Sequence, residues 1–116
     1  MRNEMSYQLL IDVSQPLRCT IGRLGEFDFP AGCYVYTGSA RRNLDARIAR
    51  HIRREKVLSW HIDYLLTSEG VHVVEVLRSR RSECALNRAS CGRILVVGFG
   101  ASDCRADCGA HLKYLG

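Results

Sequence analysis

Residues 32–56, GCYVYTGSARRNLDARIARHIRREK, combine three structural signals in one stretch of the chain. Residues 33–37 alternate in the manner of a β-strand, so Tyr34 and Tyr36 are expected to share a face. Residues 36–40 predict a tight glycine turn. An arginine-rich segment with a helical period follows. A strand, a tight turn and a basic helix together predict a surface that faces phosphate groups.

The basic charge of the chain is concentrated in this helix. Between Arg41 and Lys56 there are seven basic and two acidic residues, a balance of +5 that equals the net charge of the whole chain. With a pI of about 9.1, the chain favours an acidic partner, and nucleic acid is the first candidate. A membrane surface is disfavoured, because arginines rather than aromatic residues flank the apolar stripe of the helix.

The length of 116 residues predicts a single domain, residues 1–116, with one hydrophobic core. The apolar share of 47% and the charged share of 25% are typical of a globular protein. No apolar run approaches the roughly 20 residues that span a bilayer. The N-terminal MRNEMSYQ lacks the apolar core of a signal peptide. We therefore expect no membrane segment and a cytoplasmic location, in which thiols stay reduced.

Strand and helix patterns alternate on both sides of the basic stretch. Strands are predicted at residues 5–13, 17–29, 70–77 and 93–97, with Gly22 and Gly25 marking a turn or bulge in the second. Helices are predicted at residues 60–67 and 82–89, the latter capped by Ser82, and the tail is expected to be a loop followed by a short helix or strand. This order predicts an α+β or mixed α/β fold, with a small central mixed or antiparallel sheet flanked by helices.

Two sides of the basic helix differ in character. The stripe that recurs every four residues, and is expected to be buried, consists of Leu44, Ile48 and Ile52. The polar side carries Arg47, Arg50, His51 and Arg54. Arg47 and His51 are one turn apart, so they can point at the same place. Ser39 or Asn43 is expected to cap the start of the helix.

Short motifs follow one another in a specific order along the chain. They are Tyr7 on the first strand, GCYVYTGSA at residues 32–40, RIARHIRREK at 47–56, WHIDYLL at 60–66, SEC at 82–84 and the segment 98–112. Together they span nearly the whole chain, and their order and spacing resemble the GIY-YIG nuclease superfamily. More narrowly, the pattern resembles the Uri-type subgroup, which is sometimes found fused to endonuclease III. Two positions depart from the family pattern: only Tyr7 matches in the first triad, and Thr37 replaces isoleucine in the second.

The resemblance implies a metal-dependent endonuclease. In such enzymes a glutamate is understood to hold one divalent ion, an arginine to bind the phosphate and a tyrosine to lie near the attacking water. Carried over, Glu83 is the expected ligand of one Mg²⁺ or Mn²⁺ ion, and Arg47 is the expected phosphate ligand. Tyr7 and Tyr36 would face the site from neighbouring strands, and Tyr36 is favoured because Gly38 lies beside it. His51 would assist by hydrogen bonding or proton transfer.

The expected contacts to DNA combine the glycine turn with the basic side chains that follow it. They are Gly38, Ser39, Arg41, Arg42, Arg50, Arg54 and Lys56. From the residues alone, non-functional interpretations remain open. The arginines can be solvated surface side chains, and Glu83 can be an acidic residue in the first helical turn that interacts favourably with the helix dipole. The two tyrosines can likewise be ordinary packing residues.

The cysteines raise a second metal hypothesis. Cys84, Cys104, Cys108 and His111 are of the ligand types that zinc prefers. Their spacing is not that of a recognised zinc finger or ribbon. Reduced, buried thiols are therefore favoured over a zinc site.

Three functions remain open at this point. The favoured one is a divalent-metal-dependent endonuclease that hydrolyses phosphodiester bonds in DNA, in DNA repair or in processing of branched DNA. The alternatives are a non-catalytic nucleic-acid-binding module with a degenerate site, and a small zinc-dependent interaction protein. The joint presence of Tyr36, Arg47, His51 and Glu83 favours the endonuclease, because a binding module has no need of a carboxylate that repels phosphate. The oligomeric state and the choice between DNA and RNA stay open.

Overall fold

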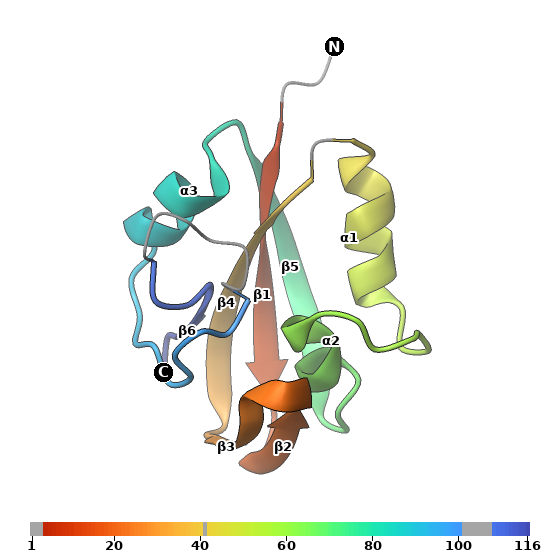
Figure 1. Cartoon of the computed structure of the whole chain (residues 1–116), viewed down its shortest axis with the longest axis vertical. Helices are drawn as coiled ribbons and strands as arrows, with labels where there is room; N and C mark the ends of the chain where they lie inside the picture. Colours follow the sequence, from red (N-terminus) through yellow and green to blue (C-terminus); the bar gives the residue numbers. More distant parts are fainter. Residues whose placement is uncertain (1–3, 41, 101–107) are drawn as a thin grey trace.

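The computed structural model describes residues 4–40, 42–100 and 108–116. Its centre is a four-stranded antiparallel sheet in the order β5–β1–β4–β6 (Figure 1). The strands are β1 (Ser6–Val13), β4 (Gly32–Ser39), β5 (Val71–Ser79) and β6 (Leu112–Tyr114). β1 and β4 are therefore neighbours at the centre of the sheet, as expected for the two strands that carry Tyr7 and Tyr36.

A second, two-stranded sheet closes one end of the molecule. It consists of β2 (Leu17–Ile21) and β3 (Gly25–Phe29), joined by the 3₁₀ turn η1 (Gly22–Leu24). Gly22 and Gly25 have φ angles of 49° and 124°, which favour glycine because it lacks a Cβ atom. The predicted break at these two glycines is confirmed. The hairpin packs against α2 (His61–Leu66).

The basic segment forms α1 (Leu44–Ile52), and the side chain of Asn43 caps it by accepting a hydrogen bond from the Ala46 N–H at 3.4 Å. Ile48 and His51 are buried, whereas Ile52 is 54% exposed. The prediction that Ile52 is buried was therefore wrong. The buried face passes from Ile48 to His51 because the imidazole ring packs among the aromatic rings of the site.

Helices cover both faces of the main sheet (Figure 1). Tyr7 and Leu9 belong to the core cluster that includes residues of α1 and α2. The intervening Gln8 points to the opposite face, because strand side chains alternate. There its amide donates to the Ser90 hydroxyl at 2.5 Å, directly after α3 (Glu83–Ala89). The N-terminus of α3 is capped by Ser82, as predicted, with Ala85 N–H as the donor at 3.2 Å.

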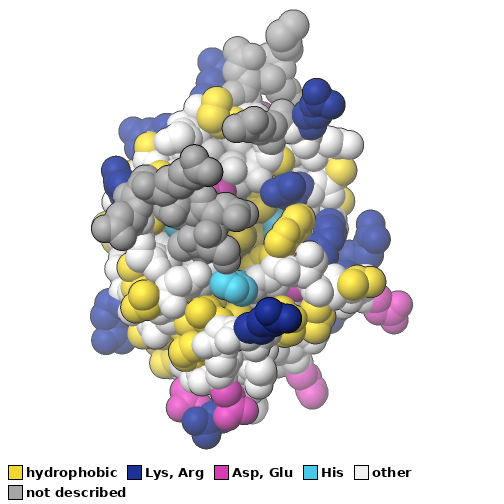
Figure 2. Space-filling model, viewed as in Figure 1, with side chains coloured by type: hydrophobic (Ala, Val, Ile, Leu, Met, Phe, Trp, Pro, Cys, Tyr) yellow, Lys and Arg dark blue, Asp and Glu magenta, His cyan; other side chains and the backbone are white. Residues whose placement is uncertain are grey.

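Charged side chains are distributed unevenly over the surface. Figure 2 shows Lys and Arg side chains along the side of the molecule that α1 occupies, and Asp and Glu side chains gathered at the end formed by β2 and β3. At that end Arg18 lies 3.0 Å from Glu26 and 3.5 Å from Asp28. These pairs are exposed and contribute little stability. Glu26 and Asp28 make the β2–β3 end of the molecule less basic than the α1 side.

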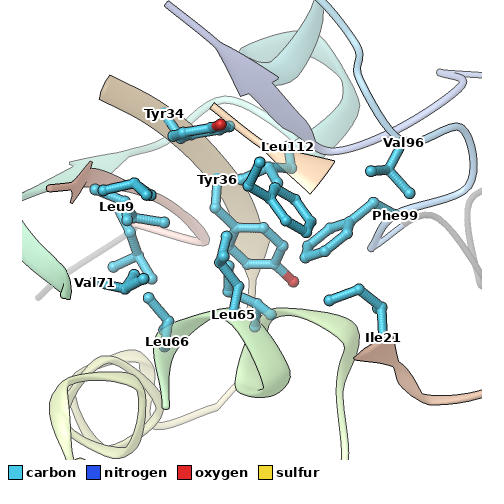
Figure 3. Packing of buried hydrophobic residues seen from close by; sticks show 14 of the residues in the cluster. Leu9, Ile21, Tyr34, Tyr36, Leu65, Leu66, Val71, Val96, Phe99 and Leu112 are labelled. Atoms are coloured by element: carbon cyan, nitrogen blue, oxygen red, sulfur yellow. The ribbon is translucent and has the colours of Figure 1, made fainter. Parts of the chain in front are cut away.

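The hydrophobic core lies between the main sheet, α2 and the segment before β6. Figure 3 shows Tyr36 packed among Leu65, Phe99 and Leu112. Leu65 and Phe99 are completely buried, and each side chain of this kind contributes about 1.5–3 kcal/mol when it leaves water. Tyr36 is therefore held by packing, and it also lines the cavity described below.

The predicted strand at residues 93–97 does not form. Only Arg93 makes a bridge, exchanging backbone hydrogen bonds of 2.9 and 2.7 Å with Tyr114, and the segment then turns so that Phe99 N–H bonds to the Val96 carbonyl at 3.3 Å. The turn places the side chains of Val96 and Phe99 in the core. The tail prediction of a short strand is confirmed by β6.

The expected α+β class is confirmed: antiparallel sheets are packed with helices. Within residues 4–40, 42–100 and 108–116, no helix is both long enough and apolar enough to cross a membrane.

Candidate active site

A cavity of about 340 Å³ opens where β1 and β4 meet α1 and the first turn of α3. Its walls come from six separate parts of the chain. They are Tyr7, Tyr36, Gly38, Ser39, Arg47, Ser59, Trp60, His61, Glu83 and Gly100. The structure thus brings four of the five expected catalytic residues to one cavity, and the fifth, His51, lies directly behind Tyr7.

Tyr7 reaches the cavity across the β1–β4 pair. It lies opposite Gly38 in the strand register, and its hydroxyl is 2.5 Å from Nε2 of His51. A Cβ atom on Gly38 would lie only 2.4 Å from the Tyr7 hydroxyl oxygen. Gly38 is therefore needed to make room for Tyr7.

Both tyrosines keep their hydroxyl protons at neutral pH. Burial raises the pKa of Tyr7 well above its ordinary value, although the charge of Arg47 lowers it in part. Burial, followed by the proximity of Tyr7, also raises the pKa of Tyr36. The two phenols are therefore neutral hydrogen-bonding groups in this site.

His51 is also neutral. It is 2% exposed, and burial lowers its pKa to about 4, with a further lowering by the charge of Lys56. Lys56 itself donates a hydrogen bond from Nζ to the His51 carbonyl oxygen at 2.7 Å. The imidazole ring lies 5.4 Å from the ring of Tyr7 and 6.0 Å from that of Tyr36. A neutral imidazole at this position can accept or donate one hydrogen bond through Nε2.

Arg47 is fixed by one side chain and one carbonyl group. Its Nη1 donates to the Ser39 carbonyl oxygen at 2.8 Å, and its guanidinium carbon lies 4.7 Å from the centroid of the Trp60 ring. A guanidinium has five N–H donors, so one bond to Ser39 does not exhaust it. The Arg47 guanidinium is thus held at the wall of the cavity in an orientation set by packing.

Arg50 has a structural role in the loop before α2. It binds the completely buried Asp63 through two parallel hydrogen bonds of 2.9 and 3.0 Å, and it also lies over Trp60 at 4.3 Å. Asp63 further accepts hydrogen bonds from the backbone N–H groups of Ser59 and Trp60, each at 2.8 Å. Burial raises the pKa of Asp63, but Arg50 and these N–H groups outweigh burial, and the pKa is lowered.

Glu83 is the first residue of α3 and the carboxylate of the cavity wall. Its Oε2 is 2.7 Å from Nδ1 of His111. Burial raises the pKa of Glu83, but hydrogen bonds from His111 and Ser39 and the charge of Arg47 lower it below its ordinary value. An ionised carboxylate with a 27% exposed side chain fits a hard divalent cation, which needs only one or two protein oxygens because it keeps several waters.

The residues expected to contact nucleic acid fall into separate groups. Gly38 and Ser39 line the cavity, and the exposed Arg42 lines a neighbouring hollow together with Ser39 and Arg47. Arg54 lies away from the cavity, where its Nη1 donates to the Val71 carbonyl at 3.0 Å. The other three expected contacts differ in status: Arg50 and Lys56 bind within the chain as described above, and Arg41 lies outside the described residues.

Sequence reasoning missed part of the cavity wall. Trp60 lines the cavity, and the guanidinium groups of Arg47 and Arg50 lie over its ring. His61 accepts a hydrogen bond at Nδ1 from the Gly100 N–H at 2.9 Å, which links the loop before α2 to the segment before β6. The motif WHIDYLL marked this region, but no pattern in it distinguished a wall residue from a core residue.

Three of the four residues of the zinc hypothesis lie close together. Cys84, Cys108 and His111 bring one ligand atom each to within 4.8 Å of one another. Cys104, the fourth residue of the zinc hypothesis, lies outside the described residues.

The fold and the cavity together define a small α+β domain with an arginine, a carboxylate and buried phenols at one site. Residues 6–116 match the DUF123 family, a domain of unknown function, and the chain belongs to that family. No curated protein and no solved structure matches the chain.

Proposed function

We propose that the protein is a divalent-metal-dependent endonuclease that hydrolyses phosphodiester bonds in DNA. One observation carries the proposal: Tyr7, Tyr36, Arg47 and Glu83 come from four different elements and line the same cavity. Such convergence of phosphate-binding, acid–base and metal-binding groups is what phosphodiester hydrolysis requires. A role in DNA repair or in processing of branched DNA belongs to the same proposal.

Arg47 binds the scissile phosphate in this proposal. A guanidinium fork matches two phosphate oxygens, and the bond to Ser39 together with the Trp60 ring holds the group in one orientation before the substrate arrives. Arg42, exposed beside the same wall, adds positive charge along the approach of the DNA backbone. Binding by backbone charge in this way carries no sequence specificity.

Tyr7 and His51 handle the proton of the attacking water. Because both groups are neutral, Tyr7 donates its hydroxyl hydrogen to Nε2 of His51 and accepts a hydrogen bond from the water. The proton of the water can then move to Tyr7 as the Tyr7 proton moves to His51. Tyr36 lies on the same face of the sheet and hydrogen bonds to the substrate from the other side.

Glu83 would hold the metal ion, which supplies positive charge to the phosphate as charge develops in the transition state. The hydrogen bond from His111 favours the ionised carboxylate and fixes its orientation. Trp60 and His61, at the start of α2, line part of the cavity and would limit access of bulk water.

The decisive experiment compares cleavage and binding in matched variants. Purified protein is incubated with supercoiled and branched DNA in Mg²⁺, Mn²⁺ or EDTA, and binding is followed by fluorescence anisotropy. Arg47→Ala and Glu83→Gln are each expected to lower cleavage at least 100-fold, a loss of roughly 3 kcal/mol or more in transition-state stabilisation. Glu83→Gln is expected to retain DNA binding, because it removes a negative charge from the cavity.

The matched controls are Arg53→Ala, at the exposed C-terminal end of α1, and Glu75→Gln, on the exposed edge strand β5. Both are expected to cleave like the wild type. Wild-type protein that binds DNA but does not cut it with either metal would instead support a binding module with a degenerate site.

A further inference from the structure

Three metal-ligating side chains meet beside Glu83, near the start of α3. Cys84 is the second residue of α3, whereas Cys108 and His111 precede β6. One ligand atom from each lies within 4.8 Å of the other two, and neither Cys84 nor Cys108 forms a disulfide bond. Two segments more than twenty residues apart in the sequence therefore supply a compact sulfur and nitrogen donor set.

We infer that Cys84, Cys108 and His111 bind a zinc ion, with the fourth position of its tetrahedron left for a further ligand such as water. Thiolate and imidazole are the ligands that zinc prefers, whereas Mg²⁺ and Mn²⁺ prefer carboxylate and water oxygens. Tetrahedral zinc with Zn–S bonds of about 2.3 Å places its sulfur ligands about 3.8 Å apart. The three ligand atoms lie within 4.8 Å of one another, so the two sulfur atoms need to approach by no more than about 1 Å to reach this geometry.

The environment of His111 carries the second part of the inference. The side chain is 1% exposed, and its Nδ1 lies 2.7 Å from Oε2 of Glu83. A histidine that binds zinc through one ring nitrogen usually directs the other to a carboxylate, which fixes the ring and strengthens it as a ligand. Glu83 meets this requirement, so Nε2 is the ring nitrogen assigned to zinc.

This zinc site would stabilise the connection between α3 and β6. α3 has only seven residues, too few for a helix to be stable on its own. Hydrogen bonds already tie its C-terminal end to β6 and the residues before it: Asn87 donates to the Ala110 carbonyl at 2.9 Å, and Lys113 donates to the carbonyls of Asn87 and Ser90. A zinc ion would join the start of α3 to the chain before β6 and thereby hold Glu83 at the cavity. The inference does not depend on nuclease activity, because a structural zinc would be needed whatever the cavity binds.

Metal content is the first test. Protein expressed without a histidine tag in zinc-supplemented medium, and purified under reducing conditions, is expected to contain about one zinc ion per chain by mass spectrometry of the metals. Cys84→Ser and Cys108→Ser are expected to lose most of it, whereas Cys91→Ser, exposed after α3 and outside the cluster, is expected to keep it. Wild-type protein without zinc, or zinc retained by both cluster variants, would overturn the site.

Stability of the wild-type protein is the second test, and it does not require the variants to fold. Removal of zinc with a strong chelator is expected to lower the melting temperature by at least about 5 °C, and added Zn²⁺ but not Mg²⁺ should restore it. Cobalt in place of zinc should give thiolate-to-metal charge-transfer absorption. A disulfide between Cys84 and Cys108 in freshly purified protein, detected by mass spectrometry, would contradict the zinc assignment.

Discussion

At the scale of single residues, the cavity depends on a glycine opposite a tyrosine. Tyr7 on β1 and Gly38 on β4 are direct partners in the strand register, and the phenol occupies the space in which a larger residue at position 38 would place its Cβ atom. The same phenol touches His51. One missing side chain on β4 therefore sets the position of two of the groups assigned to proton transfer.

Gly38→Ala is expected to displace the Tyr7 ring, because the new methyl group would lie 2.4 Å from the hydroxyl oxygen and 2.5 Å from the carbon that bears it. Overpacking of this kind lowers the free energy of unfolding by about 1–3 kcal/mol. Urea unfolding measures the effect. In a Tyr7→Leu background, which removes the far end of the ring, the same substitution should be nearly neutral. Equal losses in both backgrounds would show that the contact with Tyr7 is not the cause.

His51 predicts how stability changes with pH. Its pKa of about 4 in the folded protein lies below the value of about 6.5 in the unfolded chain, so the unfolded chain binds more protons between these values. Stability is therefore lost as pH falls through this window. From about pH 7.5 to about pH 5, His51 should account for a loss of about 2 kcal/mol.

Urea unfolding of wild type and His51→Gln at both pH values checks this prediction. The variant lacks the titrating group, so its stability should change less over the same interval. A wild type and a variant with parallel pH profiles would show that His51 is not buried in its neutral form.

At the scale of elements, α1 shows how a periodic pattern can assign the wrong buried residue. Leu44, Ile48 and Ile52 recur every four residues, but the helix ends at Ile52 and its last turn packs through His51. The aromatic rings on β1, β4 and the loop before α2 supply the partners of that imidazole. The elements packed against a short helix thus decide which of its faces is buried. The apolar pattern of the helix itself predicts that face with an error of about one residue.

Ile48→Ala and Ile52→Ala form a matched pair on this helix. Ile48 is 4% exposed and belongs to the core cluster, so its truncation should lower the free energy of unfolding by about 2–5 kcal/mol. Ile52 is 54% exposed, and its truncation should change stability by no more than about 0.5 kcal/mol. Thermal or urea unfolding of the two variants gives the comparison, and losses of equal size would contradict the described helix orientation.

At the scale of the whole molecule, much of the fold was predictable because local patterns of residues along the chain indicate its strands, turns and helix ends. Alternation predicted β1, β4 and β5, the two glycines predicted the β2–β3 turn, and Ser82 predicted the start of α3. These signals depend only on residues that are close together in the chain, so they can be recognised in the sequence without a structure. Residues 93–97 have the composition of a strand but form a turn, because Val96 and Phe99 are drawn into the core after the single bridge at Arg93.

The candidate site was only partly predictable. The residue types expected at Tyr7, Tyr36, Arg47 and Glu83 were named from the resemblance, and the structure places all four at one cavity. Arginines with different roles could not be separated from sequence: Arg47 lines the cavity, whereas Arg50 binds the buried Asp63. In the sequence both are basic residues of one helix face, and only their partners distinguish them.

The sequence by itself determined most of the strands and helices, the α+β class and the concentration of positive charge, because these follow from side-chain pattern and composition. Only the tertiary structure decided that Gly38 accommodates Tyr7, that His51 is buried and neutral, and that Glu83 pairs with His111 beside two cysteines. Each of these contacts joins residues from separate elements. Their distances are set by how strands and helices pack, which no local pattern in the chain records.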